Sequence, residues 1–322
     1  MKAVFLDYAT VDAADLSPAT LQAAASTLTL HDHTPSERVV ERLRGAEVAL
    51  INKIRLGARE LQALPELRYV GLAATGTDNV DLAAAREQGV AVTNIRDYCT
   101  PSVAQHVIAM MLTLARRLDR YRSLVRDGHW RAPKPFCLLD EPMRDLSDMT
   151  LGIVGYGALA RGVEVLARAL GMDILIANRP GGPPQPGRVD YTQVLETADV
   201  LTLHCPLTPA TKHLIDAAAL AAMRSSAILI NTARGGLVDS AALADALRAG
   251  RLGGAGIDVL GVEPPPADEP LLQPDVPNLV LTPHVAWASV KARQRALDEV
   301  AANLAAFVQG QRRHRVEGAA PD

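Results

Sequence analysis

The sequence predicts an α/β fold of two domains, each built on a parallel β-sheet with helices packed against it. Three observations support this prediction. With 322 residues, the chain is long enough for two ordinary domains with a sizeable core in each. Short apolar runs alternate with helix-like segments along most of the chain, which is the rhythm of βα units. One of these runs leads into a glycine-rich turn and then a helix.

Composition and charge restrict the class of protein. Apolar residues make up 48% and charged residues 21% of the chain, as is typical of soluble globular proteins. The net charge of -3 offers no basic surface for nucleic acid, and no apolar stretch approaches the roughly 18 residues of a membrane-spanning helix. Met1–Asp7 has the pattern of a strand and not of a signal peptide. Cys99, Cys137 and Cys205 fit no metal-binding spacing, so we expect a cytoplasmic protein without a metal site.

The first hundred residues predict four parallel strands separated by polar or helical segments. These strands are Ala3–Leu6, Val48–Asn52, Tyr69–Ala73 and Val90–Asn94. A helix then begins where Thr100 provides a cap and Pro101 occupies the first helical position, and it continues to Tyr121. Its apolar stripe consists of Val103, Val107, Met111, Leu114 and Leu118. Residues 127–147, rich in proline and charge, predict an irregular arm that carries Trp130.

A second α/β unit begins at Leu151 and contains six candidate strands. They are Leu151–Gly155, Ile174–Ala177, Val200–Leu203, Ala227–Ile230, Ala255–Val259 and Leu279–Leu281. The helices expected between them are Leu159–Leu170, Ala217–Met223 and Ala241–Ala249. Because six strands complete such a sheet, we expect the last helix, Val290–Phe307, to return to the first domain. The sequence thus predicts a doubly wound Rossmann-type dinucleotide-binding domain, residues 100–286, inserted into a flavodoxin-like substrate domain formed by residues 1–99 and 287–322.

The glycine-rich turn has the features of a dinucleotide phosphate loop. Gly155 permits the tight turn after the strand, and Gly157 lets the backbone approach a pyrophosphate. The helix expected from Leu159 then offers free N–H groups and a positive dipole end, which favour phosphate. Ala160 takes the third position of the motif, where a small residue allows close packing of helix on strand. The strand–turn–helix context indicates cofactor binding more strongly than the glycines alone.

The end of the next strand carries Asn178 and Arg179, about 20 residues beyond the loop. An Asp or Glu at this place normally binds the 2′-hydroxyl of NAD. Asn178 can hydrogen-bond that hydroxyl without repelling a 2′-phosphate, and Arg179 can pair with one. The alternative is that Arg179 is a solvated turn residue. The sequence therefore predicts NAD or NADP, with relaxed or NADP-leaning choice.

Three residues with complementary chemistry, Arg234, Glu263 and His284, each follow a predicted strand. The carboxyl ends of parallel strands lie at one edge of a sheet, where ligands bind. The pattern therefore brings a fixed cation, a carboxylate and a titratable imidazole together. Each residue taken alone has an ordinary structural interpretation, but the set favours proton-coupled reduction of an anionic carbonyl compound.

The motifs together resemble those of the D-2-hydroxyacid dehydrogenase family, in the same order and over nearly the whole chain. The motifs that carry the resemblance are the glycine-rich loop, His204–Thr208, Asn231–Gly235, Asp258–Val259 with Glu263–Pro264, and Thr282–His284. The helix from Ser102 also looks like that family. Within it, three segments are most similar to the glycerate dehydrogenase (hydroxypyruvate reductase) branch: Asn52–Lys53, Ala74–Asp81 and His284–Trp287.

The resemblance implies roles for the residues at the strand ends. His284 is the general acid in reduction, and Glu263 hydrogen-bonds its imidazole and favours the protonated form. Arg234 binds the substrate carboxylate and 2-oxo group. Backbone N–H groups that hold the carboxylate from the opposite side belong to Thr75, Gly76 and Thr77.

The resemblance also implies an NAD(P) site in which Asp258 faces the nicotinamide carboxamide. The other residues expected at this site are Gly155, Gly157, Ala158, Leu159, Asn178, Arg179, His204, Cys205, Pro206, Thr232, Ala233 and His284. The expected substrates are small 2-oxo or 2-hydroxy acids, with hydroxypyruvate/D-glycerate or glyoxylate favoured. A homodimer is implied as well, with the arm around Trp130 as a contact element.

Two alternatives remain beside this interpretation. The first is a dinucleotide-sensing binding protein that resembles the transcriptional corepressors of the same family and keeps similar residues. The second is an enzyme similar to formate dehydrogenases, in which a Gln takes the position of Glu263. The glutamate disfavours the second alternative, whereas partner binding in the presence of NADH would distinguish the first.

Overall fold

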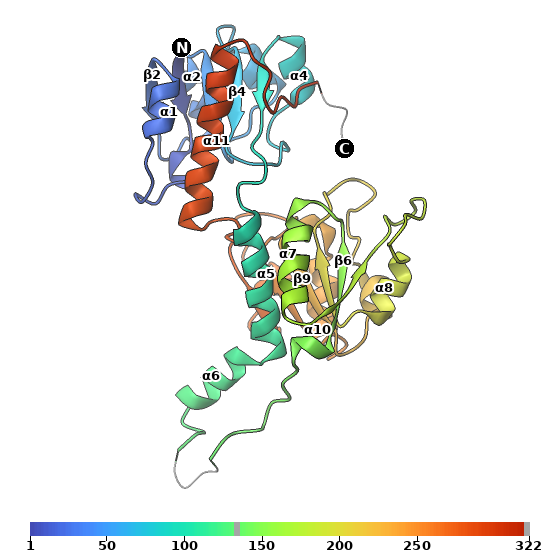
Figure 1. The fold of residues 1–322 in the computed structure, drawn as a ribbon. Coiled ribbons are helices and arrows are strands. Elements are labelled where there is room, and N and C mark those ends of the chain that lie inside the picture. Colours follow the sequence, from blue (N-terminus) through green and yellow to red (C-terminus); the bar gives the residue numbers. More distant parts are fainter. Residues whose placement is uncertain (132–135, 319–322) are drawn as a thin grey trace. The chain divides into compact units, whose positions relative to one another are not determined.

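The computed structural model describes residues 1–131 and 136–318 and divides the chain into two compact units (Figure 1). Unit 1 consists of Met1–Cys99 and Ala288–Asp322, and unit 2 of Thr100–Trp287. Unit 2 is therefore inserted into the sequence of unit 1.

Unit 1 is built on a five-stranded parallel sheet with the order β2-β1-β3-β4-β5. Its strands are β1 (Lys2–Phe5), β2 (Thr27–Leu30), β3 (Val48–Ile51), β4 (Tyr69–Leu72) and β5 (Ala91–Thr93). This order is that of flavodoxin-like folds, as predicted. Strand β2 was missed in the sequence because it lies at the edge of the sheet, where none of its four side chains is fully buried.

Helices cover both faces of this sheet. They are α1 (Ala19–Ala24), α2 (Val39–Leu43), α3 (Ala58–Gln62), α4 (Leu82–Glu87) and α11 (Val290–Val308). Because successive strand residues point to opposite faces, Val70 joins a core cluster with Leu61 of α3, whereas the ring of Tyr69 lies 4.8 Å from that of Phe307 on α11. Helix α11 also packs against α1. The last helix of the sequence thus packs within unit 1.

Unit 2 is built on a six-stranded parallel sheet with the order β11-β10-β9-β8-β6-β7. Its strands are β6 (Thr150–Val154), β7 (Asp173–Ile176), β8 (Val200–Leu203), β9 (Ile228–Asn231), β10 (Gly254–Ile257) and β11 (Leu279–Leu281). Val189 forms a parallel bridge with Ala177 just beyond β7. Counting this bridge as a rudimentary outermost strand, the order becomes the Rossmann order with one additional strand beyond β10.

The helices of unit 2 are divided between the two faces of its sheet. They are α5 (Thr100–Ala115), α6 (Leu118–Arg126), α7 (Ala158–Ala169), α8 (Tyr191–Thr197), α9 (Ala217–Ala222) and α10 (Ser240–Arg248). On β10, Gly256 faces Met110 of α5, whereas its neighbours Ala255 and Ile257 join a core cluster with α8, α9 and α10. The sheet is therefore doubly wound, and the predicted fold class is confirmed.

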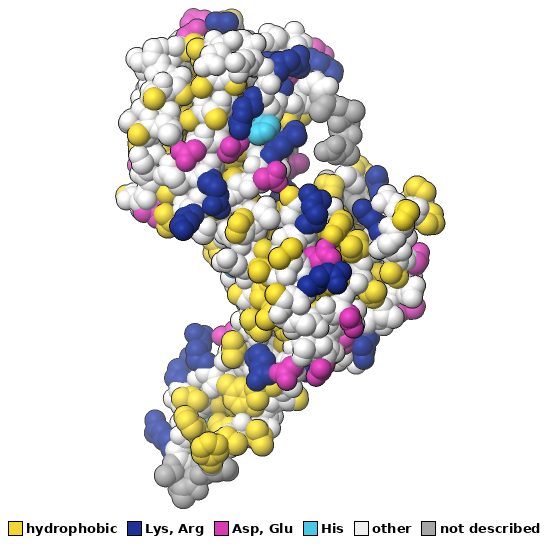
Figure 2. All heavy atoms as spheres, viewed as in Figure 1, with side chains coloured by type: hydrophobic (Ala, Val, Ile, Leu, Met, Phe, Trp, Pro, Cys, Tyr) yellow, Lys and Arg dark blue, Asp and Glu magenta, His cyan; other side chains and the backbone are white. Residues whose placement is uncertain are grey.

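The long helix predicted from Thr100 is broken in the structure. Arg117 has φ 54, in the left-handed region, and it separates α5 from α6. The break rotates the helical phase, so Leu118 is 52% exposed and does not continue the buried stripe. Figure 2 shows hydrophobic side chains gathered on this part of unit 2. The exposed apolar residues of α6 and the following arm are Leu118, Val125, Trp130, Phe136, Leu139 and Met143.

Candidate active site

The glycine-rich turn lies where the strand order of unit 2 reverses, between β6 and β8. Gly155 has φ +85, and a Cβ atom there would lie 2.5 Å from the backbone nitrogen of Cys205. Only glycine fits this position, because both the backbone conformation and the neighbouring turn exclude a side chain. The structure thus brings the predicted residues Gly155, His204 and Cys205 together at the switch point.

The first turn of α7 offers backbone donors without a side-chain cap. Its N-cap residue is Gly157, and a Cβ atom at that position would meet nothing within 4 Å. The N–H groups of Ala158 and Leu159 belong to the first turn of α7, where helix geometry gives them no intrahelical acceptor, and the helix dipole favours an anion there. Ala160 is fully buried, consistent with the close helix–strand packing expected of the third position.

The loop after β7 carries the residues predicted to meet the ribose. The side-chain oxygen of Asn178 accepts a hydrogen bond of 2.9 Å from the backbone N–H of Gln185. This bond leaves the amide nitrogen of Asn178 as the group that can donate to a ligand. Arg179 is exposed, and Arg188 at the far end of the loop lies 6.0 Å above the ring of Tyr156, within the glycine-rich turn. Two cations therefore flank this part of the site.

The turn after β8 is fixed by its own side chains. His204 Nε2 lies 3.0 Å from Thr202 Oγ1, and burial lowers the pKa of His204 to about 4, so its imidazole is neutral at physiological pH. The carbonyl of Pro206 accepts a hydrogen bond from Thr211. Burial raises the pKa of Cys205 to about 11, which keeps its thiol protonated. These features support a structural role for the turn, which lies beside the glycine-rich loop.

Arg234 follows β9, and its backbone is held by Asn231 and Gly235, the two ends of the motif noted in the sequence. The buried side chain of Asn231 donates to the carbonyl of Arg234 at 2.9 Å and accepts from the N–H of Ala233 at 3.0 Å. At Gly235, a Cβ atom would lie 1.9 Å from the carbonyl carbon of Leu260. The loop after β9 is therefore packed directly on the loop after β10, which fixes the backbone on both sides of the arginine.

Glu263 and His284 are brought together by neighbouring loops. Glu263 follows β10 and His284 follows β11, and Glu263 Oε2 lies 2.5 Å from His284 Nδ1. The second oxygen of Glu263 accepts from the N–H of Leu260 at 2.9 Å, so the carboxylate is oriented from both ends. Since β9, β10 and β11 are adjacent and parallel, Arg234 lies at the same edge of the sheet as this pair.

Asp258 and Thr232, both predicted at the cofactor site, differ in whether their polar side-chain atoms already have hydrogen-bond partners. Asp258 is 1% exposed, and its carboxylate accepts hydrogen bonds from Thr282 Oγ1 and from the N–H groups of Val285 and Ala286. Most of its hydrogen-bonding capacity therefore serves the loop that carries His284. The hydroxyl of Thr232, by contrast, is buried and has no partner among the described residues. An unpartnered buried hydroxyl at this edge fits a polar ligand.

In unit 1, the predicted substrate loop also follows a strand end. Thr75 Oγ1 donates to the carbonyl of Ile95 at 2.9 Å, and Asn94 donates to the carbonyl of Thr75 at 2.7 Å. These bonds fix the backbone on which Gly76 and Thr77 lie. Thr75 is exposed, whereas Gly76 and Thr77 are half-buried.

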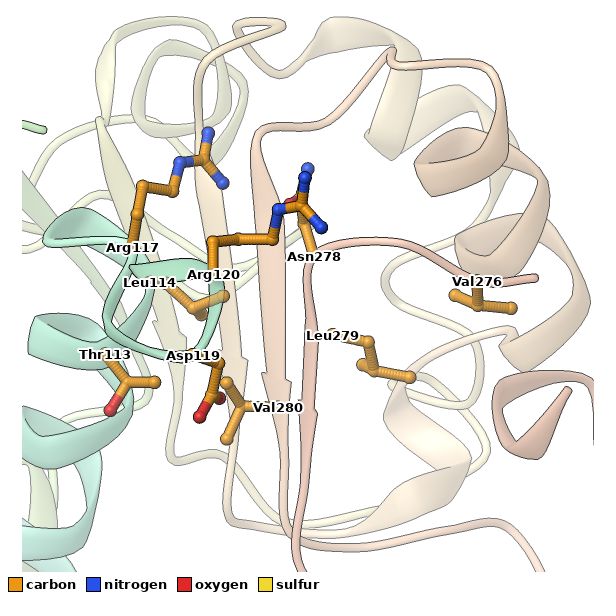
Figure 3. Close-up of a pocket in the computed structure, with 9 residues that line it drawn as sticks. All are labelled: Thr113, Leu114, Arg117, Asp119, Arg120, Val276, Asn278, Leu279 and Val280. Atoms are coloured by element: carbon orange, nitrogen blue, oxygen red, sulfur yellow. The ribbon is translucent and has the colours of Figure 1, made fainter. Parts of the chain in front are cut away.

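A hollow of about 130 Å³ lies at the opposite end of the unit 2 strands (Figure 3). It is formed by the end of α5, the start of α6 and the residues that lead into β11, and its lining includes Arg117, Arg120 and Asn278. The figure shows the guanidinium group of Arg120 beside Asn278. Arg117 donates to the carbonyl of Gly253, and Arg120 pairs with Glu141. This hollow is separate from the edge that carries Arg234, Glu263 and His284.

The described part of the chain holds neither a cluster of metal ligands nor a membrane-spanning helix. Within residues 1–131 and 136–318, no group of three or more His, Cys, Asp or Glu side chains could hold a metal ion. In the same described ranges, no helix combines the length and apolar character needed to cross a bilayer.

Comparison with known proteins identifies the class to which this site belongs. Residues 108–286 match the family model for the NAD binding domain of D-isomer specific 2-hydroxyacid dehydrogenases. A glycerate dehydrogenase from Methylorubrum extorquens is 50% identical over 284 residues, which are 88% of this chain and 89% of that protein. A hydroxypyruvate reductase from Blautia hydrogenotrophica is 33% identical and covers 96% of this chain and 98% of its own length.

A solved structure shares the fold. An acyclic imino acid reductase, Bsp5, in complex with NADPH and D-Arg, has a TM-score of 0.84 and 25% identity. The match covers 98% of this chain and 100% of that one. The fold and the site thus define a dinucleotide-dependent oxidoreductase, and this chain belongs to the D-isomer specific 2-hydroxyacid dehydrogenase family. The resemblance inferred from the sequence motifs is confirmed.

Proposed function

We propose that this protein interconverts a small 2-oxo acid and its D-2-hydroxy acid, with hydroxypyruvate/D-glycerate or glyoxylate as the favoured substrate. The observation that carries the proposal is the 2.5 Å contact between Glu263 and His284 at the sheet edge that also carries Arg234. The names of two relatives, a glycerate dehydrogenase and a hydroxypyruvate reductase, point to the same substrates.

His284 is the proposed acid and base. Because its Nδ1 is engaged by the carboxylate of Glu263, that nitrogen carries a proton and Nε2 is the atom that exchanges one with the substrate. In reduction, Nε2–H gives its proton to the carbonyl oxygen, and Glu263 keeps the ring in one orientation throughout. In oxidation, the neutral Nε2 removes the hydroxyl proton.

Arg234 is the proposed binding group for the substrate carboxylate and 2-oxo oxygen. A planar guanidinium can make two parallel hydrogen bonds to such a pair of oxygens, which a lysine cannot. The backbone around it is fixed by Asn231 and Gly235, so little freedom is lost when the substrate binds. We further propose that the N–H groups of Thr75, Gly76 and Thr77 bind the same carboxylate.

The residues of unit 2 fit a nicotinamide dinucleotide. Gly157 and the uncapped first turn of α7 suit the pyrophosphate, the buried hydroxyl of Thr232 lacks a partner among the described residues, and Asn178 has an amide nitrogen available for the ribose. We propose that Leu159, His204, Pro206, Ala233 and Asp258 complete the groove. When bound, the cofactor supplies or accepts the hydride.

Relaxed or NADP-leaning cofactor choice is proposed from the loop after β7. No carboxylate stands at Asn178 to repel a 2′-phosphate, and Arg179 and Arg188 supply positive charge. The fold neighbour in complex with NADPH is consistent with this choice. Measured kcat/KM should be at least as high with NADPH as with NADH, and Arg179→Ala should reduce the NADPH value selectively. A strong preference of the wild-type protein for NADH would contradict the proposal.

The deciding experiment is oxidation of NADPH and NADH, followed at the nicotinamide absorbance, with hydroxypyruvate, glyoxylate, pyruvate and 2-oxoglutarate. Turnover is expected to be fastest with hydroxypyruvate or glyoxylate. If none of the four is reduced while the cofactor still binds, the proposed substrates are wrong, and the corepressor-like alternative should be tested by partner binding with NADH.

The substrate-binding role of Arg234 is tested with a matched arginine. Arg234→Ala should lower kcat/KM by roughly 10²–10⁴-fold, because a charge-assisted, bidentate contact is lost. Arg251→Ala removes an exposed arginine of the same unit and should leave activity unchanged. Near wild-type kcat/KM for Arg234→Ala on a confirmed substrate would contradict the role.

We propose a homodimer in which the arm of unit 2 contacts a second copy. The arm exposes several large apolar side chains, and Phe136 is 93% exposed, which is costly in water unless a partner covers it. Light scattering after size-exclusion chromatography should give twice the chain mass, and Phe136→Glu should shift it toward one chain mass. A monomeric wild-type protein would contradict the proposal.

A reducing cytoplasm is the proposed location, because Cys99, Cys137 and Cys205 are all unpaired. Three free thiols in a freshly lysed, alkylated sample would agree with it, and an intermolecular disulfide would not.

A further inference from the structure

The loop that carries His284, residues 282–287, needs support from its surroundings. His284 has φ 58, in the left-handed region, which a residue with a side chain rarely adopts. Its N–H donates to the carbonyl of Asp258 at 2.7 Å and to that of Thr282 at 3.0 Å. Such a conformation persists only where neighbouring groups impose it. The groups that impose it here can be identified.

The carboxylate of Asp258 binds this loop on both sides of His284. Before the histidine, Thr282 Oγ1 donates to Asp258 Oδ1 at 2.5 Å. After it, the N–H of Val285 donates to Oδ1 and the N–H of Ala286 to Oδ2, each at 2.9 Å. A carboxylate that is 1% exposed and accepts three hydrogen bonds is a rigid centre for the loop.

Helix α5 adds two contacts to the same loop from the side. Ser102 Oγ donates to the carbonyl of Ala286 at 2.8 Å, and His106 Nε2 lies 3.1 Å from Thr282 Oγ1 and 3.7 Å from Asp258 Oδ1. Ser102 and His106 are four residues apart, so both lie on one face of α5. Because α5 packs against α7, β9 and β10, this face is a firm base.

The direction of the hydrogen bond from His106 follows from the donors available. Thr282 has a single hydroxyl proton, which it gives to the carboxylate of Asp258 at 2.5 Å. His106 Nε2 must therefore carry the hydrogen and donate to the threonine oxygen. A chain of hydrogen bonds then runs from α5 through Thr282 to Asp258, and it ends at the backbone that holds His284.

We propose that His106 and Ser102 are positioning residues, which act through Thr282 and Asp258 to hold His284 in the orientation needed for proton transfer. The proposal rests on the proposed acid–base function of His284. Neither residue need touch substrate or cofactor for this purpose. Their loss should lower the rate of the chemical step while substrate and cofactor still bind.

The test compares His106→Ala, His106→Gln and Ser102→Ala with Gln105→Ala, an exposed neighbour on the same helix. His106→Ala should lower kcat by roughly 10–100-fold, since misplacement of a reacting group by about 1 Å costs about that much. KM and the cofactor Kd should stay within about threefold of wild type. Glutamine keeps an N–H near the Nε2 position and should restore much of the rate. Ser102→Ala should have a smaller effect in the same direction, and Gln105→Ala none.

A double mutant separates positioning from general stability. In a His284→Ala background, adding His106→Ala should leave the residual rate unchanged, because His106 acts only through the missing imidazole. A further loss of rate there, an unchanged kcat for His106→Ala alone, or a parallel fall in Tm and cofactor affinity would overturn the proposal. If His284→Ala itself retains wild-type kcat, the proposed function of His284 fails, and the positioning proposal fails with it.

Discussion

Each sheet of this protein has a switch point, where its strand order reverses. The two switch points are built from different residues. In unit 1 the reversal lies between β1 and β3, where the carboxylate of Asp7 accepts hydrogen bonds of 2.6–3.1 Å from the backbone N–H groups of residues 52–54. In unit 2 it lies between β6 and β8, where Gly155 packs on Cys205 and the first turn of α7 has no side-chain cap.

The difference shows how a switch point can be closed by a side chain in one domain and left open in another. A set of backbone donors at a switch point attracts an anion. In unit 1 the chain supplies its own anion, since Asp7 is 2% exposed and fully engaged. In unit 2 glycine leaves the donors accessible, so a phosphate group can take the place that a carboxylate fills in unit 1.

The largest loss of stability is expected when the carboxylate of Asp7 is removed from the switch point of unit 1. Asp7→Ala leaves the backbone N–H groups of residues 52–54 without their acceptor, the first of them buried, and should lower the free energy of unfolding by about 3 kcal/mol or more. Asp7→Asn keeps one side-chain oxygen as an acceptor and should lose less. Urea unfolding measures both. A loss below about 1 kcal/mol for Asp7→Ala would mean that the carboxylate does not close the switch point.

At the open switch point, two glycines should respond differently. Gly155→Ala forces a side chain into a left-handed conformation and against Cys205, so it should cost about 1–3 kcal/mol of stability and weaken cofactor binding at least tenfold. Gly157→Ala meets no atom within 4 Å and should change stability by less than about 1 kcal/mol while still weakening cofactor binding. Thermal unfolding and a fluorescence titration with NADPH distinguish the two. Unchanged affinity in Gly157→Ala would show that no ligand approaches this backbone.

The pH dependence of stability reports on His204, which borders the open switch point. Burial holds its pKa at about 4, below the ordinary 6.5, so the unfolded chain takes up the proton first as pH falls. The contribution of neutral His204 to the free energy of unfolding is complete above about pH 7. It is lost progressively toward pH 4, by up to roughly 3 kcal/mol. Unfolding free energies at pH 7 and pH 5 should therefore differ less in His204→Gln than in wild type. Equal differences would show that His204 does not titrate as expected.

The smallest effect concerns Thr232, whose buried hydroxyl lacks a partner among the described residues. Thr232→Val preserves the shape and removes the unsatisfied group, so the cofactor-free protein should become more stable by about 1 kcal/mol. Cofactor affinity should fall at the same time, because the hydroxyl no longer meets the ligand. A stability gain without a loss of affinity would remove Thr232 from the cofactor site.

Much of this architecture could be predicted because strong local patterns coincide with tertiary structure. The apolar runs of the buried strands, the glycine turn before α7 and the strand-end positions of Arg234, Glu263 and His284 are all visible in the sequence. The pairing of Glu263 with His284 follows from adjacent strands, once their order is known. The resemblance to a family supplied the roles, which spacing alone could not.

Other features depend on contacts between distant segments and left no local signal. The support of the His284 loop by Ser102 and His106 joins residues 176 or more positions apart. The helix break at Arg117 and the need for glycine at position 235 are likewise set by tertiary packing. Asp7 had a weak signal, since a carboxylate that directly follows the first strand lies at a switch point in a 2-1-3-4-5 sheet. That inference required β2, which the sequence did not reveal.

The return of α11 to unit 1 has a consequence for the order in which the chain can fold during synthesis. The strands of unit 1 emerge from the ribosome before unit 2, but they lack the helix that packs on β4 and α1 until α11 is made. Strand β5 also lacks one hydrogen bond until Glu317 is made, because the carboxylate of Glu317 accepts a hydrogen bond from the N–H of Val92. Unit 2 begins later in the sequence, but its last residue is synthesised before the second segment of unit 1. The inserted unit 2 can therefore finish folding before unit 1 is complete.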